Sequence, residues 1–316
     1  MPNAKTAFFY NPLSHTVASR GSVLEKVSDA HDVMKFKLDD FEKLNTYVTQ
    51  ALDNKVDTIF IEGGDGTIQG VITETILQLD NSTPPPNFVL LPGGMTNLVA
   101  ANIGLKRPSV DKITSIMRNP NSRKSTSLPL LKIEQDGGAN LHFGFLLSTG
   151  ALPAATRYCL DEIHTKGIGG SAAVGTTLFK VLFGPKKKRR EIMAPTPIQL
   201  QLGDRTIEGE HLTSVATTLP KLIIGINPFW GEDNAPVHLT YADPNVRHKF
   251  INIARMFKKQ QSSRARAALE RDGFHSWNIE SATLVHDGPL VLDGEELPLS
   301  TKPMRLSTTD PLTFLS

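Results

Sequence analysis

The segment that most constrains the fold lies between residues 56 and 79, where an apolar run, a glycine-rich turn and a stretch of helical spacing follow one another. Thr58 to Ile61 is apolar and rich in β-branched residues, which predicts a strand buried on both faces. From Thr67 the apolar residues recur at helical spacing, so we expect an amphipathic helix. Its apolar face comprises Ile68, Val71, Ile72, Ile76 and Leu79.

The turn between this strand and helix has the character of a phosphate-binding loop. Gly63, Gly64 and Gly66 allow a ligand to approach the backbone closely, and a helix that begins here directs free N–H groups at one point. Asp65 could help to hold Mg²⁺. An ordinary turn is the simpler interpretation, but three glycines in four residues cost more backbone entropy than a turn needs. The spacing matches neither the Walker nor the dinucleotide pattern.

Strands and helices alternate through the first part of the chain, which predicts a three-layer α/β domain with a mostly parallel sheet and helices on both faces. Ligands of such sheets bind at the carboxyl ends of the strands. Asn11, Gly63 to Thr67 and Gly93 to Asn97 all follow predicted strands, so we expect these three loops to converge. The other expected strands are Thr6–Tyr10, Val33–Leu38 and Phe88–Leu91, and the helices are a stretch ending near Ser28, Phe41–Leu52 and Thr96–Ile103.

From about Ser125 short apolar stretches recur between Gly, Asp and Pro turns, which predicts an all-β, sandwich-like domain. We expect an α/β domain over residues 1–124, which the tail 308–316 can rejoin, and a β domain over residues 125–307. Helical insertions are expected at Ala154–Leu160 and from Asn245 to about Arg271. The expected strands are Leu128–Ile133, Leu141–Leu147, Ile198–Leu202, Leu222–Ile226, Val237–Tyr241, Ser281–Val285, Pro289–Leu292 and Met304–Ser307.

Composition limits the partners and the compartment. With 39% hydrophobic and 21% charged residues and a net charge of +2, the chain has the profile of a soluble globular protein and needs no polyelectrolyte partner. Its single cysteine, Cys159, excludes an intramolecular disulfide and fits a reducing compartment. We find neither a signal peptide nor an apolar run that spans a membrane. The expected location is cytoplasmic, with any membrane contact peripheral.

Two basic stretches bear on that contact. One is the run from Lys186 to Arg190, and the other recurs from Arg255 to Arg271 on an expected helix. A solvated face is the usual explanation, and no nucleic-acid recognition motif accompanies the charge. Near an anionic membrane, each basic residue contributes roughly 1 kcal/mol. We therefore hypothesise that this run docks on a membrane through Lys186, Lys187, Lys188, Arg189 and Arg190.

The turn Gly63-Gly64-Asp65-Gly66-Thr67 resembles the GGDGT signature of the diacylglycerol kinase catalytic domain family, which includes soluble bacterial lipid kinases and sphingosine and ceramide kinases. Asn11-Pro12 with Ser14 resembles the NPxSG loop of these kinases, and Leu91 to Asn97 resembles their second nucleotide loop. Met95 stands where the family has threonine, and Leu98 where it has aspartate. The resemblance implies nucleotide contacts at Asn11, Gly63, Gly64, Asp65, Gly66, Thr67, Gly94, Thr96 and Asn97.

An acidic turn near the end of the chain, Asp293-Gly294-Glu295, completes the resemblance. As a bare pattern it is weak, because acidic turns between strands are common. It resembles the DGE motif that the family assigns to the general base region. By this resemblance either Asp293 or Glu295 accepts the proton of the acceptor hydroxyl, and a neighbouring carboxylate can raise the pKa of such a base.

Together these features predict an ATP-dependent kinase that phosphorylates the hydroxyl of a diacylglycerol-like lipid at an anionic membrane surface, with a role in phospholipid biosynthesis. Mg²⁺ is the expected metal, with Asp65 and Asp233 as candidate ligands. Nucleic acid is not an expected partner, and a homodimer is compatible with the sequence. Met95 and Leu98 keep open a nucleotide- or lipid-binding protein without kinase activity. An NAD-kinase-like enzyme is a further alternative. Gly144-Phe145-Leu146 resembles a Gly-Phe-Leu segment of that group, but a match this short is expected by chance.

Overall fold

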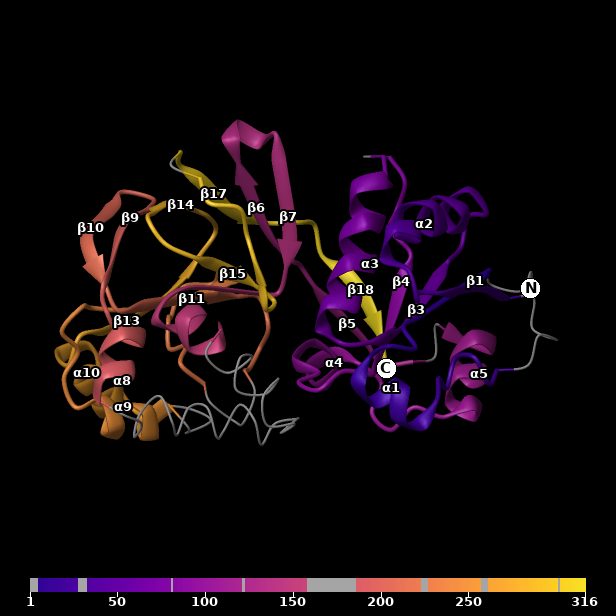
Figure 1. The fold of residues 1–316 in the computed structure, drawn as a ribbon, viewed down its shortest axis with the longest axis horizontal. Coiled ribbons are helices and arrows are strands. Elements are labelled where there is room, and N and C mark those ends of the chain that lie inside the picture. The colour runs from indigo at the N-terminus through magenta and orange to yellow at the C-terminus, as the bar shows by residue number, and fades with distance from the viewer. Residues whose placement is uncertain are drawn as a thin grey trace. The chain divides into compact units, whose positions relative to one another are not determined.

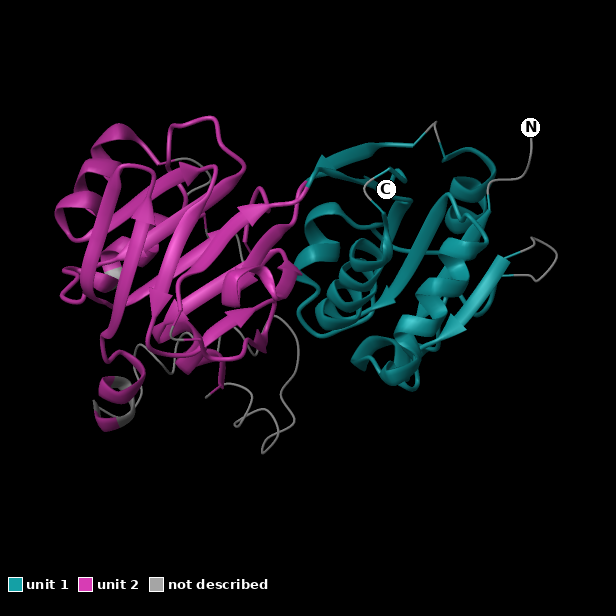
Figure 2. Cartoon of the chain, turned by 90° about the horizontal axis from the view of Figure 1, so that it is seen from above, with its two compact units in different colours: residues 1–128, 310–316 teal, residues 129–309 magenta. Residues whose placement is uncertain are grey.

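The chain divides into two compact units. Unit 1 comprises residues 1–128 and 310–316, and unit 2 comprises residues 129–309 (Figure 2). The computed structural model describes residues 5–27, 33–80, 82–120, 123–157, 186–222, 227–256, 261–300 and 302–316. Unit 1 is an α/β structure and unit 2 is built mainly from β-strands, so the expected change of architecture along the chain is confirmed at that level.

Unit 1 contains one six-stranded sheet in the order β2-β1-β3-β4-β18-β5. β2, β1, β3, β4 and β18 run parallel to one another, whereas β5 pairs antiparallel with β18. The sheet is therefore mostly parallel. Its strands are β1 (Thr6–Tyr10), β2 (Val33–Lys37), β3 (Thr58–Gly63), β4 (Asn87–Pro92), β5 (Ser125–Leu128) and β18 (Leu312–Leu315).

The helices of unit 1 follow the parallel strands, as Figure 1 shows for α3 after β3 and α4 after β4. Every residue of β3 is buried, because apolar side chains cover the central strand on both faces. Phe8 and Phe60 pack edge to face on one side of the sheet, in a core that α5 completes with Ile113 and Ile116. The helical segments are α1 (His15–Arg20), η2 (Phe41–Lys43), α2 (Leu44–Asp53), α3 (Asp65–Gln78), α4 (Leu98–Ile103) and α5 (Val110–Arg118).

Unit 2 contains two six-stranded antiparallel sheets, in the orders β10-β9-β14-β17-β6-β7 and β13-β12-β11-β8-β15-β16. Apolar residues from both sheets pack into one core, with Ile133 and Leu284 from the first and Leu239 and Leu292 from the second. The strands are β6 (Leu131–Gln135), β7 (Asn140–Gly144), β8 (Leu146–Gly150), β9 (Thr196–Leu202), β10 (Arg205–His211), β11 (Thr213–Thr217), β12 (Val237–Ala242), β13 (Phe274–Ile279), β14 (Ala282–His286), β15 (Leu290–Leu292), β16 (Glu295–Glu296) and β17 (Met304–Thr308).

The helices of unit 2 include α8 (Lys186–Ile192), α9 (Lys249–Met256) and α10 (Ser263–Arg271). Residues 151–157 are also helical, whereas Cys159 lies outside the described residues. A short 3-10 segment, η4 (Asp136–Gly138), joins β6 to β7. Within the described ranges, none of the helices is both long and apolar enough to span a bilayer.

Several expected elements were wrong in extent. The helix expected to reach Ser28 ends at Arg20, because Gly21 has a φ of 78° and the chain turns away. The stretch expected as one strand, Leu141–Leu147, forms β7 and β8 with a break at Phe145. The long helix expected from Asn245 is replaced by α9 and α10. Most of the expected strand Leu222–Ile226 lies outside the described residues.

Candidate active site

The loops that follow β1, β3 and β4 meet at the carboxyl edge of the unit 1 sheet. The backbone N–H of Asn11 donates to the carbonyl of Glu62 (2.9 Å), and the N–H of Gly93 donates to the carbonyl of Gly63 (2.8 Å). Thr16, at the start of α1, donates its N–H to the carbonyl of Gly93 (2.8 Å). Backbone hydrogen bonds therefore join all three loops, which are the loops that the sequence placed together.

Side chains of the first loop hold the glycine turn after β3. Ser14 Oγ accepts the N–H of Gly64 (3.2 Å), and Asn11 Nδ2 donates to Thr67 Oγ1 (3.0 Å). The Oδ1 atom of Asn11 accepts the N–H of Leu13 (2.9 Å), which fixes the turn that carries Ser14. The asparagine thus has a defined structural task in addition to its expected nucleotide contact.

The glycines of the two later loops are required by the close approach of two backbones. A Cβ atom on Gly94 would lie 2.5 Å from the Cα of Gly64, and one on Gly93 would lie 2.8 Å from the Cα of Gly63. No side chain fits at such separations. These glycines are therefore needed, before any ligand is considered, because the backbones of the two loops pack directly against each other.

Asn97 fixes the shape of the loop after β4. It adopts a left-handed backbone conformation with a φ of 51°, which asparagine tolerates better than most residues. Its side chain exchanges two hydrogen bonds of 2.8 Å with the backbone of Gly94. Thr96 is exposed beside it, so its hydroxyl can reach a ligand.

Asp65 joins the glycine turn to α4. Its two carboxylate oxygens accept the N–H groups of Leu98 (3.0 Å) and Val99 (3.1 Å), which are otherwise unpaired at the start of that helix. Burial raises the pKa of Asp65, although the N–H groups of Val99, Leu98 and Asn97 act in the opposite direction. The carboxylate that the sequence offered as a metal ligand therefore also serves as the cap of α4.

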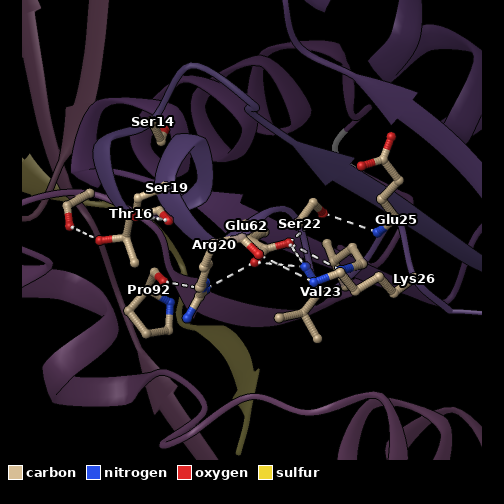
Figure 3. Close-up of polar contacts among 12 residues, drawn as sticks. Ser14, Thr16, Ser19, Arg20, Ser22, Val23, Glu25, Lys26, Glu62 and Pro92 are labelled. Carbon is tan, nitrogen blue, oxygen red and sulfur yellow. Dashed lines mark hydrogen bonds and ion pairs between the residues drawn. The ribbon is translucent and has the colours of Figure 1, made fainter.

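A buried carboxylate that the sequence analysis missed lies under these loops. Glu62, the residue before Gly63, has no exposed surface. Its Oε2 accepts the hydroxyl of Ser22 (2.6 Å) and the N–H groups of Val23 (2.9 Å) and Leu24 (3.1 Å). Figure 3 shows Ser22 and Val23 beside Glu62. This arrangement explains why α1 ends at Arg20, since the next residues turn toward the carboxylate.

Arg20 is the cation of this cluster. Its Nη2 atom donates to Glu62 Oε1 (3.0 Å) and to the carbonyl of Pro92 (3.0 Å), as Figure 3 shows. These two partners directly precede Gly63 and Gly93, so the guanidinium lies where the two glycine loops begin. About a third of the Arg20 side-chain surface, 35%, is accessible to solvent. An acid at the end of an otherwise apolar strand was the sequence signal that could have revealed the pair.

The acidic turn of unit 2 gives its two carboxylates different environments. Asp293 has a φ of 51°, and its Oδ2 and Oδ1 atoms accept the N–H groups of Phe145 (2.8 Å) and Leu146 (2.8 Å). Asp293 also donates its own N–H to the carbonyl of Leu146 (2.9 Å). It therefore bridges the break between β7 and β8.

Glu295, in contrast, is exposed on the short strand β16. The next residue, Glu296, pairs with Arg157 at 2.6 Å. The sequence could not distinguish these two carboxylates, but their environments differ. Asp293 accepts two backbone N–H groups, whereas Glu295 is exposed to solvent.

The loop geometry of unit 1 agrees with the result of sequence comparison. Residues 5–128 match the diacylglycerol kinase catalytic domain. The resemblance seen in the Gly63–Thr67 turn is therefore confirmed for this segment. No curated protein matches the chain.

Solved structures with the same fold extend over both units. One, a candidate diacylglycerol kinase from Bacillus anthracis strain Sterne, has a TM-score of 0.69 and 15% identity, and the match covers 100% of this chain and 98% of that chain. Another, a diacylglycerol kinase from the same organism, has a TM-score of 0.65 and 14% identity, with 100% and 97% covered. At these identities the similarity establishes the fold.

Within the segment that matches the diacylglycerol kinase catalytic domain, the departures from the family pattern have structural consequences. Leu98 is buried, with 7% of its surface exposed, where the family carries an aspartate, and Asp65 binds its backbone N–H. Met95 is only partly buried. The second loop therefore keeps its backbone form while it lacks one expected carboxylate.

The remaining predicted site residues lie in unit 2, outside the segment that matches the family model. Asp233 is exposed, and its carbonyl accepts a hydrogen bond from Asn278 Nδ2 (2.7 Å). Among the described residues there is no cluster of three or more His, Cys, Asp or Glu side chains that could hold a metal ion. The predicted basic run forms most of α8, where Lys187 and Arg190 are exposed. The side chains of Lys186, Lys188 and Arg189 lie outside what the structure describes.

Proposed function

We propose that this protein is an ATP-dependent lipid kinase that phosphorylates a hydroxyl of a diacylglycerol-like lipid. The observation that carries the proposal is the hydrogen-bonded junction of the three loops after β1, β3 and β4 within a segment that matches the diacylglycerol kinase catalytic domain. Loops at the carboxyl edge of a parallel sheet are the usual ligand-binding position in such folds.

The nucleotide phosphates would bind at the N-terminus of α3. This helix has 14 residues and begins at Asp65, so its first N–H groups and dipole favour an anion. Thr96 would add a hydroxyl. The three loops themselves contain no lysine or arginine, and Arg20, which is ion-paired with Glu62, lies at their base. Phosphoryl transfer depends mainly on positioning and charge neutralisation, and these groups provide both.

The residues present suit Mg²⁺ that is bound chiefly by ATP. Mg²⁺ in kinases usually takes one or two carboxylates and the substrate phosphates. Asp65 fits this pattern, because a carboxylate has about four lone-pair positions and the N–H groups at the start of α4 do not fill all of them. Asp233 remains a candidate of lower priority. When bound, the ion would neutralise charge on the phosphates.

Glu295 is the proposed general base. An exposed carboxylate can accept the proton of a lipid hydroxyl, whereas Asp293 already holds two backbone N–H groups. In this proposal Asp293 fixes the backbone conformation of the turn, and Glu295 accepts the proton. The proposed role places the protein at membranes and in phospholipid synthesis.

A nucleotide-binding protein without kinase activity is the second candidate. It is favoured by Leu98, whose buried apolar side chain stands where the family has an acid. Both candidates would bind nucleotide at the loops of the sheet edge, and only the kinase would transfer phosphate to an acceptor. Nucleotide binding alone therefore does not distinguish them.

The test is transfer of labelled phosphate from γ-labelled ATP to a mixed lipid extract in the presence of Mg²⁺, with NAD⁺ as a competing acceptor. We expect a labelled lipid whose formation falls at least a hundredfold in Glu295→Gln, because general-base catalysis contributes on the order of 10²–10⁴ in rate. Glu296→Gln, which alters the neighbouring exposed acid, is the matched control and should retain activity.

Chromatography of the product would identify the acceptor. Measurable ATP binding without any labelled product would reject the kinase in favour of the binding protein. Label in NAD⁺ instead of lipid would reject the lipid acceptor.

A further inference from the structure

Positive charge is strongly segregated along this chain. The described segments 186–193, 245–256 and 261–272 carry eleven Lys or Arg and three Asp or Glu, whereas the whole chain has 34 and 32. The rest of the chain is therefore acidic overall. These segments contain α8, α9 and α10, so the charge belongs to one group of helices.

The three helices share one apolar core, which places them at the same end of unit 2. Met256 at the end of α9 and Leu269 of α10 are buried in one cluster with Leu212 and Trp230, and Met193, directly after α8, packs against it. Figure 1 shows α8, α9 and α10 gathered there. The exposed basic residues of the three helices and their flanks therefore lie at the same end of unit 2.

A buried aspartate fixes α9 and α10 to each other. Asp272 is 2% exposed and accepts hydrogen bonds from Asn252 Nδ2 (3.0 Å) and His248 Nδ1 (3.2 Å), while Arg255 lies 3.5 Å away. Hydrogen bonds from Asn252 and His248, and the nearby charge of Arg271, hold the pKa of Asp272 below its usual value. One of the three acids in these segments is therefore internal, where it pairs with Arg255 and Arg271.

The helices α8, α9 and α10 and the residues that flank them carry exposed cations as well as an exposed aliphatic side chain. Lys187, Arg190, Arg247 and Arg264 are exposed, and none of them has an acidic partner among the described residues. Ile251, on α9, is 54% exposed. Basic residues around an exposed aliphatic side chain are typical of helices that lie in the interface of an anionic membrane.

We infer that α8, α9 and α10 form a membrane-docking surface for an anionic lipid bilayer, with Ile251 inserted among the headgroups. This extends the hypothesis drawn from residues 186–190 alone to a surface of three helices. A bilayer fits better than a nucleic acid because an exposed isoleucine gains nothing from a phosphate backbone, whereas it gains free energy in an acyl boundary.

The test is co-sedimentation of the full chain with phosphatidylglycerol-containing vesicles, with pure phosphatidylcholine vesicles for comparison. ATP is omitted, so the result does not depend on the proposed kinase function. Each basic residue strengthens such binding by roughly fivefold, so Lys187→Gln/Arg190→Gln should weaken it about thirtyfold, and so should Arg247→Gln/Arg264→Gln. Lys5→Gln/Lys55→Gln removes the same charge from exposed positions of unit 1 and should leave binding unchanged.

Ile251→Ser tests the insertion separately from charge, and it should weaken binding about tenfold. Partition coefficients unchanged in both charge variants would overturn the docking surface, and so would equal binding to phosphatidylcholine. Binding to a labelled DNA duplex but not to vesicles would identify the surface as a nucleic-acid site and also reject the inference. Unchanged binding of Ile251→Ser would reject the role of α9.

Discussion

At the scale of single residues, Arg20 gives the sharpest test of the proposed phosphate site. Its guanidinium contacts the residues that precede both glycine loops. A hydrogen bond to a charged group contributes about 1.5–3 kcal/mol, so Arg20→Gln should raise the KM for ATP roughly ten- to a hundredfold. Arg20→Lys keeps the charge but not the planar guanidinium, and it should give a smaller increase.

Ser22→Ala is the matched control for Arg20. It removes another donor to the same buried carboxylate without removing a cation. We expect it to lower the free energy of unfolding by about 1–3 kcal/mol and to leave the KM for ATP unchanged. If both variants lower stability and neither changes the KM, Arg20 serves only to neutralise Glu62.

Substitution of Asp293 should lower the thermal stability, whereas substitution of Glu295 should not. Asp293→Asn replaces one carboxylate oxygen by an NH₂ group that faces a backbone N–H of Phe145 or Leu146. We expect a lower thermal midpoint, with about 1–3 kcal/mol lost. Glu295→Gln should leave the midpoint unchanged, since its side chain is exposed. An equal midpoint for Asp293→Asn and the wild type would contradict the structural role of Asp293.

At the scale of elements, the two glycine loops act as one unit because their backbones touch. Gly94→Ala would place a methyl group 2.5 Å from the Cα of Gly64, and overpacking of this kind costs about 1–3 kcal/mol. The loops must then separate, so we expect weaker ATP binding as well as lower stability. Calorimetric titration with ATP and thermal unfolding measure the two effects.

Gly70→Ala is the control for this substitution. Gly70 lies inside α3, and a Cβ atom there would meet its nearest neighbour, in Phe41, at 3.4 Å. Alanine favours a helix interior over glycine by about 1 kcal/mol, so this variant should be as stable as the wild type or more stable. ATP affinity that is unchanged in Gly94→Ala would contradict the coupling of the two loops.

Elements with a strong local pattern could be predicted from the sequence. β1, β3 and β4 are apolar runs followed by Pro or Gly, and the convergence of their loops follows from the parallel sheet alone. β10 could not be found in this way, because it is an exposed edge strand with little apolar content. β11 and β13 are rich in hydroxyl and polar side chains and also lack the periodicity that marks a strand.

Contacts between residues that are far apart in the sequence are the second feature that could not be predicted. Arg20 and Glu62 are 42 residues apart, and Asp293 reaches Phe145 across 148 residues. Nothing in the local sequence pairs such residues, since the pairing depends on the register of strands. For the same reason the sequence offered Asp65 as a metal ligand without revealing that it caps α4.

At the scale of the whole molecule, buried histidines should make unit 2 sensitive to acid. His211 is fully buried and donates through Nδ1 to the carbonyl of Thr196 (2.9 Å), while its Nε2 faces Thr149 Oγ1 (2.6 Å). Tyr241 stacks on its ring, and His286 lies edge-on at 5.2 Å. Burial lowers the pKa of His211 to about 4 and also lowers that of His286.

The sign of the effect follows from where the proton binds. Between the unfolded-state pKa of about 6.5 and the folded-state pKa of about 4, His211 binds its proton in the unfolded chain and not in the folded one. Stability is therefore complete above about pH 6.5 and declines as the pH falls toward 4, by about 3 kcal/mol for His211. Asp65 of unit 1 has a raised pKa, so its protonation on acidification acts in the opposite direction.

The two tryptophans allow this decline to be measured in unit 2 alone, because Trp230 and Trp277 both lie in it. Thermal unfolding followed by tryptophan fluorescence should show a midpoint that falls between about pH 6.5 and pH 4.5. His211→Gln should reduce this dependence, although it lowers stability at neutral pH because the packed ring is lost. His15→Gln, at an exposed position of unit 1, should leave the dependence intact. A fluorescence midpoint that stays constant over this range would mean that His211 accepts its proton within the folded core, and the buried hydroxyl chain through Thr149 would then have to reorganise to receive it.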